Sequence, residues 1–166
     1  MKAPKHLTLF ALVLVAVLLT GSPVMAAAQR SPFTGTANFG ETLSAGEWLY
    51  LPSGNVQVRG IVEAYHDVNT DPRVTGIETI VSNGNFRAAP SSPLGLAGYL
   101  WGTFHIENAG GTWDGTFTSE ITEGGEYFYR GVAHGSGGYE GLVGHWDAYR
   151  NGHSGPFALS GWILEP

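Results

Sequence analysis

The clearest structural signal in this chain lies in residues 99–122, whose sequence is YLWGTFHIENAGGTWDGTFTSEIT. The pattern Trp-Gly-Thr-Phe at 101–104 returns as Trp-Asp-Gly-Thr-Phe at 113–117, and the polar, glycine-rich run 108–111 separates the two copies. Aromatic and β-branched residues on both sides of a few turn residues are typical of a β-hairpin. We therefore predict two antiparallel strands joined by a four-residue loop at 108–111.

This loop fixes the cross-strand partners in the predicted hairpin. It places Phe104 opposite Gly115 and Gly102 opposite Phe117, so each large ring fills the space that a glycine leaves open. No helical pattern is available to cover a second apolar surface, so the face with phenylalanines and glycines is expected to point inward. The other face carries Tyr99 and Trp101, which are expected on the outside.

A second hairpin is expected at Gly124-Gly125, because two glycines between apolar runs favour a two-residue turn. That turn pairs Ile121 with residue 128 and Phe117 with residue 132. Since Phe117 and Ile121 point inward, the alternate residues of the next strand should point inward too. These residues are Phe128, Arg130, Val132 and His134.

An arginine and a histidine in an apolar interior require an explanation, because a buried charge is costly unless it is paired or reached by water. One interpretation is a structural ion pair between Arg130 and an inward Glu63 or Glu78. The other is that Arg130 and His134 anchor the polar head of a ligand whose apolar body contacts the interior rings. The candidate ligand-binding residues are Phe104, Phe117, Phe128, Arg130, Val132 and His134.

The rest of the chain extends the same β pattern. Candidate strands cover 33–39, 47–51, 55–66, 74–83, 96–107, 112–122, 126–135, 139–149 and 156–164. Runs of Gly, Pro, Asn and Ser separate them, including a long loop at 84–95. Eight or nine strands with short connections predict an all-β fold, a single antiparallel eight-stranded β-barrel, which has no exposed edges. A two-sheet sandwich is the alternative.

The first 28 residues have the pattern of a cleaved signal peptide. Lys2 and Lys5 precede an apolar run at 7–19, Gly21-Ser22-Pro23 breaks it, and Ala26-Ala27-Ala28 offers a cleavage site. The apolar run is short for a membrane span, which needs about 20 residues. We expect a secreted or periplasmic protein whose β-barrel domain covers 29–166, with no membrane partner after cleavage.

Composition narrows the classes of partner. The chain has 8 Lys and Arg against 14 Asp and Glu, a formal net charge of −6, and both lysines lie in the signal segment. Nucleic acid is therefore an improbable partner, because phosphate binding needs a basic patch. The chain has no cysteine, so disulfides, thiol chemistry and cysteine metal sites are excluded.

Residues 131–144, GVAHGSGGYEGLVG, resemble the glycine-rich hairpin of the allene oxide cyclase barrel proteins. The matching residues are Gly135, Ser136, Gly137, Tyr139, Gly141 and Gly144, and plant dirigent proteins are similar in the same stretch. The resemblance covers the last third of the chain. It implies a calycin-like, eight-stranded antiparallel barrel, often a homo-oligomer, whose mostly apolar cavity controls how a reactive small molecule cyclises or couples. No catalytic position of that family matches this chain residue by residue.

The sequence contains only weak indications of a metal site or of hydrolase chemistry. His105 with Glu107 and His145 with Asp147 share strand faces, and Asp114 lies across from His105. Such groups are common on an acidic surface, so neither a metal nor a cofactor is expected. The sequence lacks the Gly-x-Ser-x-Gly motif of a hydrolase nucleophile.

Three functions remain open at this point. The first is binding of a small, mostly apolar ligand inside the barrel. The second is an isomerase or cyclase in which His134 moves a proton and Arg130 stabilises an anionic oxygen. The third is a cell-envelope or matrix interaction protein with a filled barrel, which uses Tyr99, Trp101 and Tyr129 on the outer wall as a subunit interface or a platform for sugar rings.

Overall fold

The computed structural model describes residues 28–92, 95–152 and 154–166. The signal peptide expected at 1–28 therefore lies, apart from its last residue, outside the described residues. The described part of the chain contains no helix of the length and apolarity that crossing a membrane requires.

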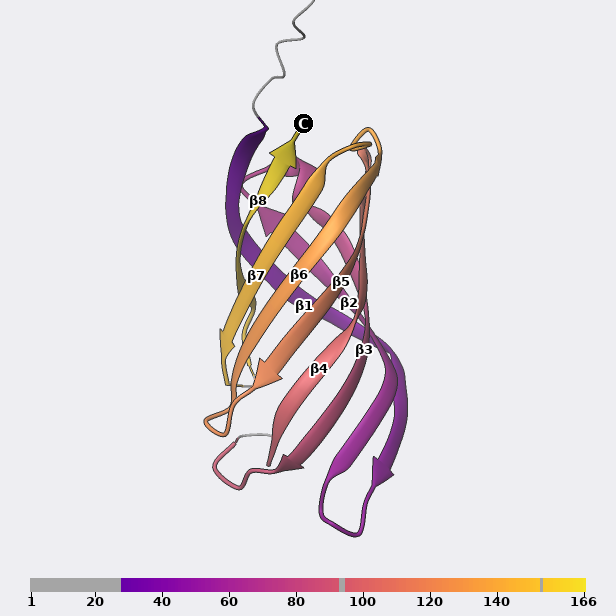
Figure 1. Ribbon diagram of the computed structural model, residues 1–166, viewed down its shortest axis with the longest axis vertical. Helices are drawn as coiled ribbons and strands as arrows, with labels where there is room; N and C mark the ends of the chain where they lie inside the picture. Colours follow the sequence, from indigo (N-terminus) through magenta and orange to yellow (C-terminus); the bar gives the residue numbers. More distant parts are fainter. Residues whose placement is uncertain (1–27, 93–94, 153) are drawn as a thin grey trace, which may run out of the picture.

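Eight antiparallel strands, each hydrogen-bonded to the next, form one closed sheet, and β1 completes it by pairing with β8 (Figure 1). The strands are β1 Gln29–Tyr50, β2 Val56–Asn69, β3 Gly76–Ala88, β4 Leu96–Asn108, β5 Gly111–Ile121, β6 Glu126–Gly137, β7 Val143–Asn151 and β8 Phe157–Glu165. In the described residues the one helical element is the short 3-10 turn η1, Pro72–Val74, between β2 and β3. The predicted all-β class and the eight-stranded closed sheet are confirmed.

The first two predicted strands, 33–39 and 47–51, belong to one long strand. β1 continues through the glycine-containing segment between them by register shifts between Phe39 and Glu41 and between Thr42 and Ser44. Gly46 has a φ of 68°, a conformation that glycine adopts without strain. Together with β2, this strand forms a hairpin that extends beyond the other strands at the lower end of Figure 1.

The register predicted for the first hairpin is confirmed. Phe104 pairs with Gly115 and Gly102 with Phe117 between β4 and β5. The pairing continues to Asn108 and Gly111, so the connection holds only residues 109–110 instead of the four predicted. The ring of Phe104 lies where a side chain at Gly115 would have to be, so the two residues fit only as a large and small pair. Phe104 and Phe117 are buried in the interior.

The register predicted for the second hairpin is wrong by one residue. Thr122 pairs through its backbone with Glu126, so the loop holds three residues, with Gly125 at a φ of 85°. Loops of three residues with a left-handed glycine are the next most common hairpin connection after two-residue turns. Phe117 consequently faces Gly131, and Ile121 faces Tyr127. Because strand side chains alternate, this shift turns the predicted inward set to the outside.

Two further differences concern loops. The run Asn83-Gly84-Asn85 lies inside β3, so the connection predicted at 84–95 is reduced to 89–95. The glycine-rich hairpin turns before β7, which begins at Val143 instead of 139. In that turn Tyr139 is buried, stacks on Trp113, and donates a hydrogen bond from its hydroxyl to Asn108 Oδ1 at 2.6 Å.

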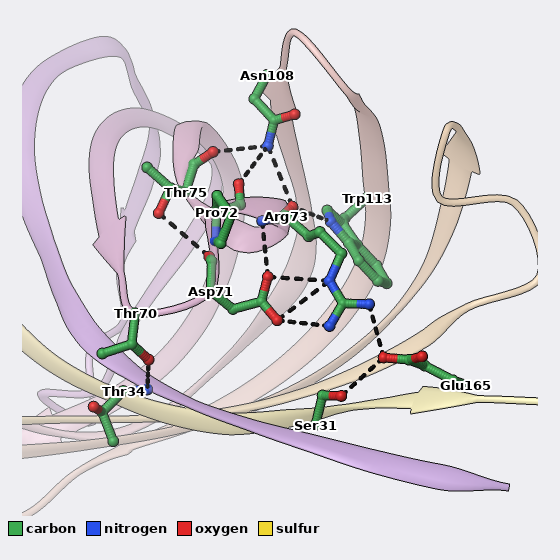
Figure 2. Close-up of polar contacts among 10 residues, drawn as sticks. All are labelled: Ser31, Thr34, Thr70, Asp71, Pro72, Arg73, Thr75, Asn108, Trp113 and Glu165. Atoms are coloured by element: carbon green, nitrogen blue, oxygen red, sulfur yellow. Dashed lines mark hydrogen bonds and ion pairs between the residues drawn. The ribbon is translucent and has the colours of Figure 1, made fainter.

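The end of the sheet that carries η1 is filled. Its core contains Phe33, Val74, Ile106, Trp113 and Ile163, all almost inaccessible to solvent. Hydrogen bonds hold η1 over this core: Trp113 Nε1 donates to the Arg73 carbonyl at 2.7 Å, and Asn108 Nδ2 donates to the Thr75 carbonyl at 2.7 Å (Figure 2).

An ion-pair network fixes the same end. The Arg73 guanidinium contacts Asp71 at 2.7 Å and Glu165 at 2.8 Å, and Ser31 donates a hydrogen bond to the same Glu165 oxygen (Figure 2). These bonds connect η1 to both β1 and β8, the two strands that close the sheet. The free interior space consequently lies towards the opposite end.

Candidate functional site

The corrected register separates the candidate residues into two groups. Phe104 and Phe117 are 3% and 6% exposed and line the interior, as predicted. Phe128, Arg130, Val132 and His134 lie on the outer face of β6 and are exposed, so the predicted inward orientation of these four is wrong. Arg130 bonds to Asp147 on the neighbouring strand β7, with Nε and Oδ1 3.1 Å apart, and reaches neither Glu63 nor Glu78.

The interior beyond the filled end contains a cavity of about 540 Å³. Its walls are mostly aromatic and aliphatic and include Phe117 and Tyr129. At its outer end lie Phe39 and Trp48, whose rings are half exposed and come from the long strand β1. A space of this size, enclosed by apolar rings with a few polar groups among them, has the properties of a small-molecule pocket.

Two carboxyl groups provide the strongest polarity in this cavity. Asp67 on β2 is 2% exposed and Glu78 on β3 is 6% exposed. Glu78 pairs directly across the strands with Tyr65, and Asp67 is two residues further along β2, so all three share the inner face. Oδ1 of Asp67 is buried and has no hydrogen-bond partner in the part of the chain that the structure describes.

Burial alters the acidity of this pair. It raises the pKa of Asp67 to about 7, because a carboxylate loses its hydration there. Burial and the adjacent charge of Asp67 raise the pKa of Glu78 well above its usual range. Two interacting carboxyls of this kind titrate as a unit and hold a proton at neutral pH.

Two hydrogen-bond donors complete the inner surface of the cavity. The hydroxyl of Tyr129 and Nε1 of Trp146 are both buried without an acceptor among the described residues. Burial, followed by the charges of Glu78 and Asp67, raises the pKa of Tyr129 well above its usual value, so its hydroxyl stays protonated. An unpaired buried donor costs free energy, which a bound acceptor would recover.

One cation and one further carboxylate lie closer to the entrance. The Arg150 guanidinium stacks on the rings of Tyr127 and Phe157 at 4.4 and 4.2 Å from their centroids. Glu63 accepts a hydrogen bond from the Tyr65 hydroxyl at 3.1 Å. Burial and then Glu63 raise the pKa of Tyr65 above its usual range. The charged side chains that line the cavity are thus three carboxyl groups and one arginine.

The outer wall carries a second, shallower hollow of about 640 Å³ across β4 to β8. Tyr99 and Trp101 face it and are 59% and 37% exposed, which confirms their predicted outward orientation. The one-residue register error also affected Tyr129, which was expected beside them and instead points inward. Phe128 and Arg130 also line this outer hollow.

The histidine pairs form surface contacts. His105 Nδ1 lies 2.8 Å from Asp114 Oδ1 and its Nε2 lies 3.8 Å from Glu107, and all three side chains are exposed. His145 instead stacks on Trp162, with ring centroids 3.7 Å apart. Among the described residues no group of three or more His, Cys, Asp or Glu is arranged to hold a metal ion.

Asp67, Tyr129 and Trp146 line the cavity and are not among the site residues predicted from the sequence. The alternation Ile61, Glu63, Tyr65, Asp67 on β2 was the available signal, since residues two apart share a strand face. One interpretation of the sequence placed either Glu63 or Glu78 inward as the partner of Arg130, and both residues line the cavity without that partner.

Comparisons with family models, with characterised proteins and with solved structures find no match to this chain. The likeness to the allene oxide cyclase barrel proteins therefore remains a prediction from the sequence.

Proposed function

We propose that this chain is an exported protein that binds a small, mostly apolar molecule inside its closed sheet. The observation that carries the proposal is the 540 Å³ cavity, which has aromatic walls and buried polar groups without partners. Phe104 and Phe117 remain in the proposal as interior rings. Asp67, Glu78 and Tyr129 replace Arg130 and His134 as the groups that contact the polar part of the ligand.

A fold of the allene oxide cyclase type is part of the same proposal. The resemblance at 131–144 and the eight-stranded closed sheet support it. Proteins of that kind enclose their small molecules in the interior, which agrees with the position of the cavity in this chain.

Isomerase or cyclase activity is a second candidate, and the carboxyl pair favours it. A general acid or base works best with a pKa near the operating pH, and that of Asp67 is raised to about 7. The ionised carboxyl would take a proton from a carbon next to a carbonyl group. The Tyr129 hydroxyl would donate a hydrogen bond to the carbonyl oxygen, and the same carboxyl would return the proton to another carbon.

Native mass spectrometry of the protein purified from its own producer tests the proposal, because it reports both a retained molecule and the subunit count. We expect a small molecule bound to wild type and to Arg130→Met, whose side chain lies outside. Ile80→Trp should lose it, because Ile80 lines the cavity and not the outer hollow, and an indole there occupies the space of the ligand.

The opposite pattern would overturn interior binding. If the bound molecule is lost in Arg130→Met and retained in folded Ile80→Trp, the binding surface is the outer hollow. That result would favour an interaction protein that uses its outer aromatic residues. Near-UV circular dichroism of each variant verifies that the fold is retained.

A further inference from the structure

The innermost charged groups of the cavity have no cation beside them. Among the described residues, no ion pair joins Asp67 or Glu78 to an arginine or histidine. Burial raises the pKa of both carboxyls, and the charge of Asp67 adds to the effect at Glu78. Arg150 is engaged at the entrance by Tyr127, Phe157 and the Gly152 carbonyl. A buried carboxyl pair without a counter-ion is stabilised when a cation binds between its members.

The other groups that face the pair are aromatic or acidic. Tyr65 lies across from Glu78, Tyr129 approaches from β6, and Glu63 lies further along β2 towards the entrance. Aromatic faces attract an organic cation, and the attraction grows when water is excluded. The cavity therefore combines negative charge with ring faces, which disfavours an anionic ligand.

A buried hydrogen-bond donor gives a second, independent constraint on the ligand. Trp146 is 2% exposed and lines the cavity, and its Nε1 has no acceptor within residues 28–92, 95–152 and 154–166. The indole N–H can only donate, so neither carboxyl protonation nor a cation satisfies it. An oxygen atom on the ligand would do so.

We propose that the ligand is an aromatic or alicyclic amine that also carries an oxygen atom. Its ammonium group lies between Asp67 and Glu78, its body contacts the rings of Tyr129 and Phe117, and its oxygen accepts from Trp146. This inference rests on the proposed interior binding and narrows it to one ligand class.

Proton release distinguishes this ligand class from a neutral one. The ammonium keeps its proton, and the proton held by the carboxyl pair leaves to the solvent when both carboxylates face the cation. Binding of an amine should therefore strengthen by about tenfold between pH 5.5 and 7.5, since a ligand that prefers the ionised pair binds better as pH rises. A neutral analogue should lack this dependence.

Isothermal titration calorimetry with three matched probes tests the inference. The probes are 5-methoxytryptamine, 5-methoxytryptophol and 5-methoxyindole-3-acetic acid, which share one ring system and differ in an ammonium, hydroxyl or carboxylate group. We expect the amine to bind most tightly at pH 7.5, with an enthalpy that changes with the buffer because a proton is released. The alcohol should bind more weakly and release none.

Substitutions of the two buried carboxyls test where the ammonium group of the ligand binds. Asp67→Asn should weaken amine binding by about tenfold and alcohol binding by less than about twofold, and Glu78→Gln should act in the same direction. Asp147→Asn is the matched control, because it removes the same charge from the outer face. It should leave all three affinities unchanged.

The possible failures can be told apart. If the alcohol or the acid binds at least as tightly as the amine, or if folded Asp67→Asn and Glu78→Gln keep full amine affinity, the amine assignment is wrong and interior binding stands. If none of the three probes binds at millimolar concentration, both the assignment and the proposed function are overturned.

Discussion

Among single residues, Asp67 is the one whose burial has the clearest consequence for stability. Its carboxyl is buried, and one of its oxygens lacks a hydrogen-bond partner. A group in that position binds a proton more readily in the folded chain than in the unfolded chain. The folded state is therefore favoured by protonation.

Asp67→Asn should flatten the dependence of stability on pH. The pKa of Asp67 is raised from 3.8 to about 7, so the folded state binds more protons than the unfolded state between these values. The free energy of unfolding of wild type should accordingly fall as pH rises from 5 to 7, by up to about 1.4 kcal/mol per pH unit for each such carboxyl. Urea denaturation across this range measures the slope.

The matched variant for this measurement is Asp147→Asn, whose carboxyl is on the outer surface and keeps the wild-type slope. An unchanged slope in Asp67→Asn would mean that the group is ionised at neutral pH. The raised pKa would then be wrong, and the isomerase candidate would lose its support.

At the scale of elements, one turn residue determines which face of β6 is inside. The three-residue loop Glu123-Gly124-Gly125 pairs Thr122 with Glu126 and so aligns Tyr127 with Ile121. A two-residue loop would have aligned Phe128 there. The chemistry of the cavity, with Tyr129 inside and Arg130 outside, follows from this single difference in loop length.

Gly125→Ala should lower the free energy of unfolding by about 1 to 2 kcal/mol, because its φ of 85° is in the left-handed region that side chains disfavour. Gly124→Ala is the control. A Cβ at Gly124 meets its nearest neighbour at 3.6 Å, an ordinary contact distance, so this change should cost far less. Equal losses of stability in the two variants, compared by thermal denaturation, would contradict the importance assigned to the turn conformation.

At the scale of the whole molecule, the two ends of the closed sheet have different roles. One end is filled by apolar side chains and held by η1 and its ion pairs (Figure 2). The other end contains the cavity and the long β1–β2 hairpin. The contacts that hold the fold at η1 and the cavity proposed to bind a ligand therefore lie at opposite ends of one sheet.

This division predicts a stability maximum at mildly acidic pH. Hydrogen bonds from Arg73 lower the pKa of Asp71 and of Glu165. These two carboxylates therefore stabilise the folded state at pH values above the pKa of an ordinary carboxyl group, and this stabilisation is lost as pH falls. The raised pKa values of Asp67 and Glu78 have the opposite effect, because stability falls as pH rises above the pKa of an ordinary carboxyl group. The free energy of unfolding should be greatest near pH 4 to 5.

Arg73→Gln should reduce the loss of stability on the acid side of this maximum and lower the maximum itself. Denaturation curves collected from pH 3 to 8 compare the variant with wild type. Arg87→Gln is a suitable control, because Arg87 makes an exposed ion pair with Glu123 at the end of the sheet opposite to η1. If both variants follow the same curve, the network at η1 does not stabilise this end.

The sequence alone was sufficient for the all-β class, the eight-stranded closed sheet, and the fit of Phe104 to Gly115 and Phe117 to Gly102. These follow from local rules, because strand alternation and turn residues operate over a few neighbours. The inward position of Glu63 and Glu78 was also within reach of that reasoning.

Only the tertiary structure showed that Asp67, Glu78, Tyr129 and Trp146 meet in one cavity while Arg130 and His134 remain outside. The length of the loop at 123–125 differs from the simplest prediction by one residue, and one residue is enough to exchange the two faces of a strand. The burial that raises the pKa of Asp67 likewise depends on closure of the sheet between β1 and β8, which no local pattern encodes.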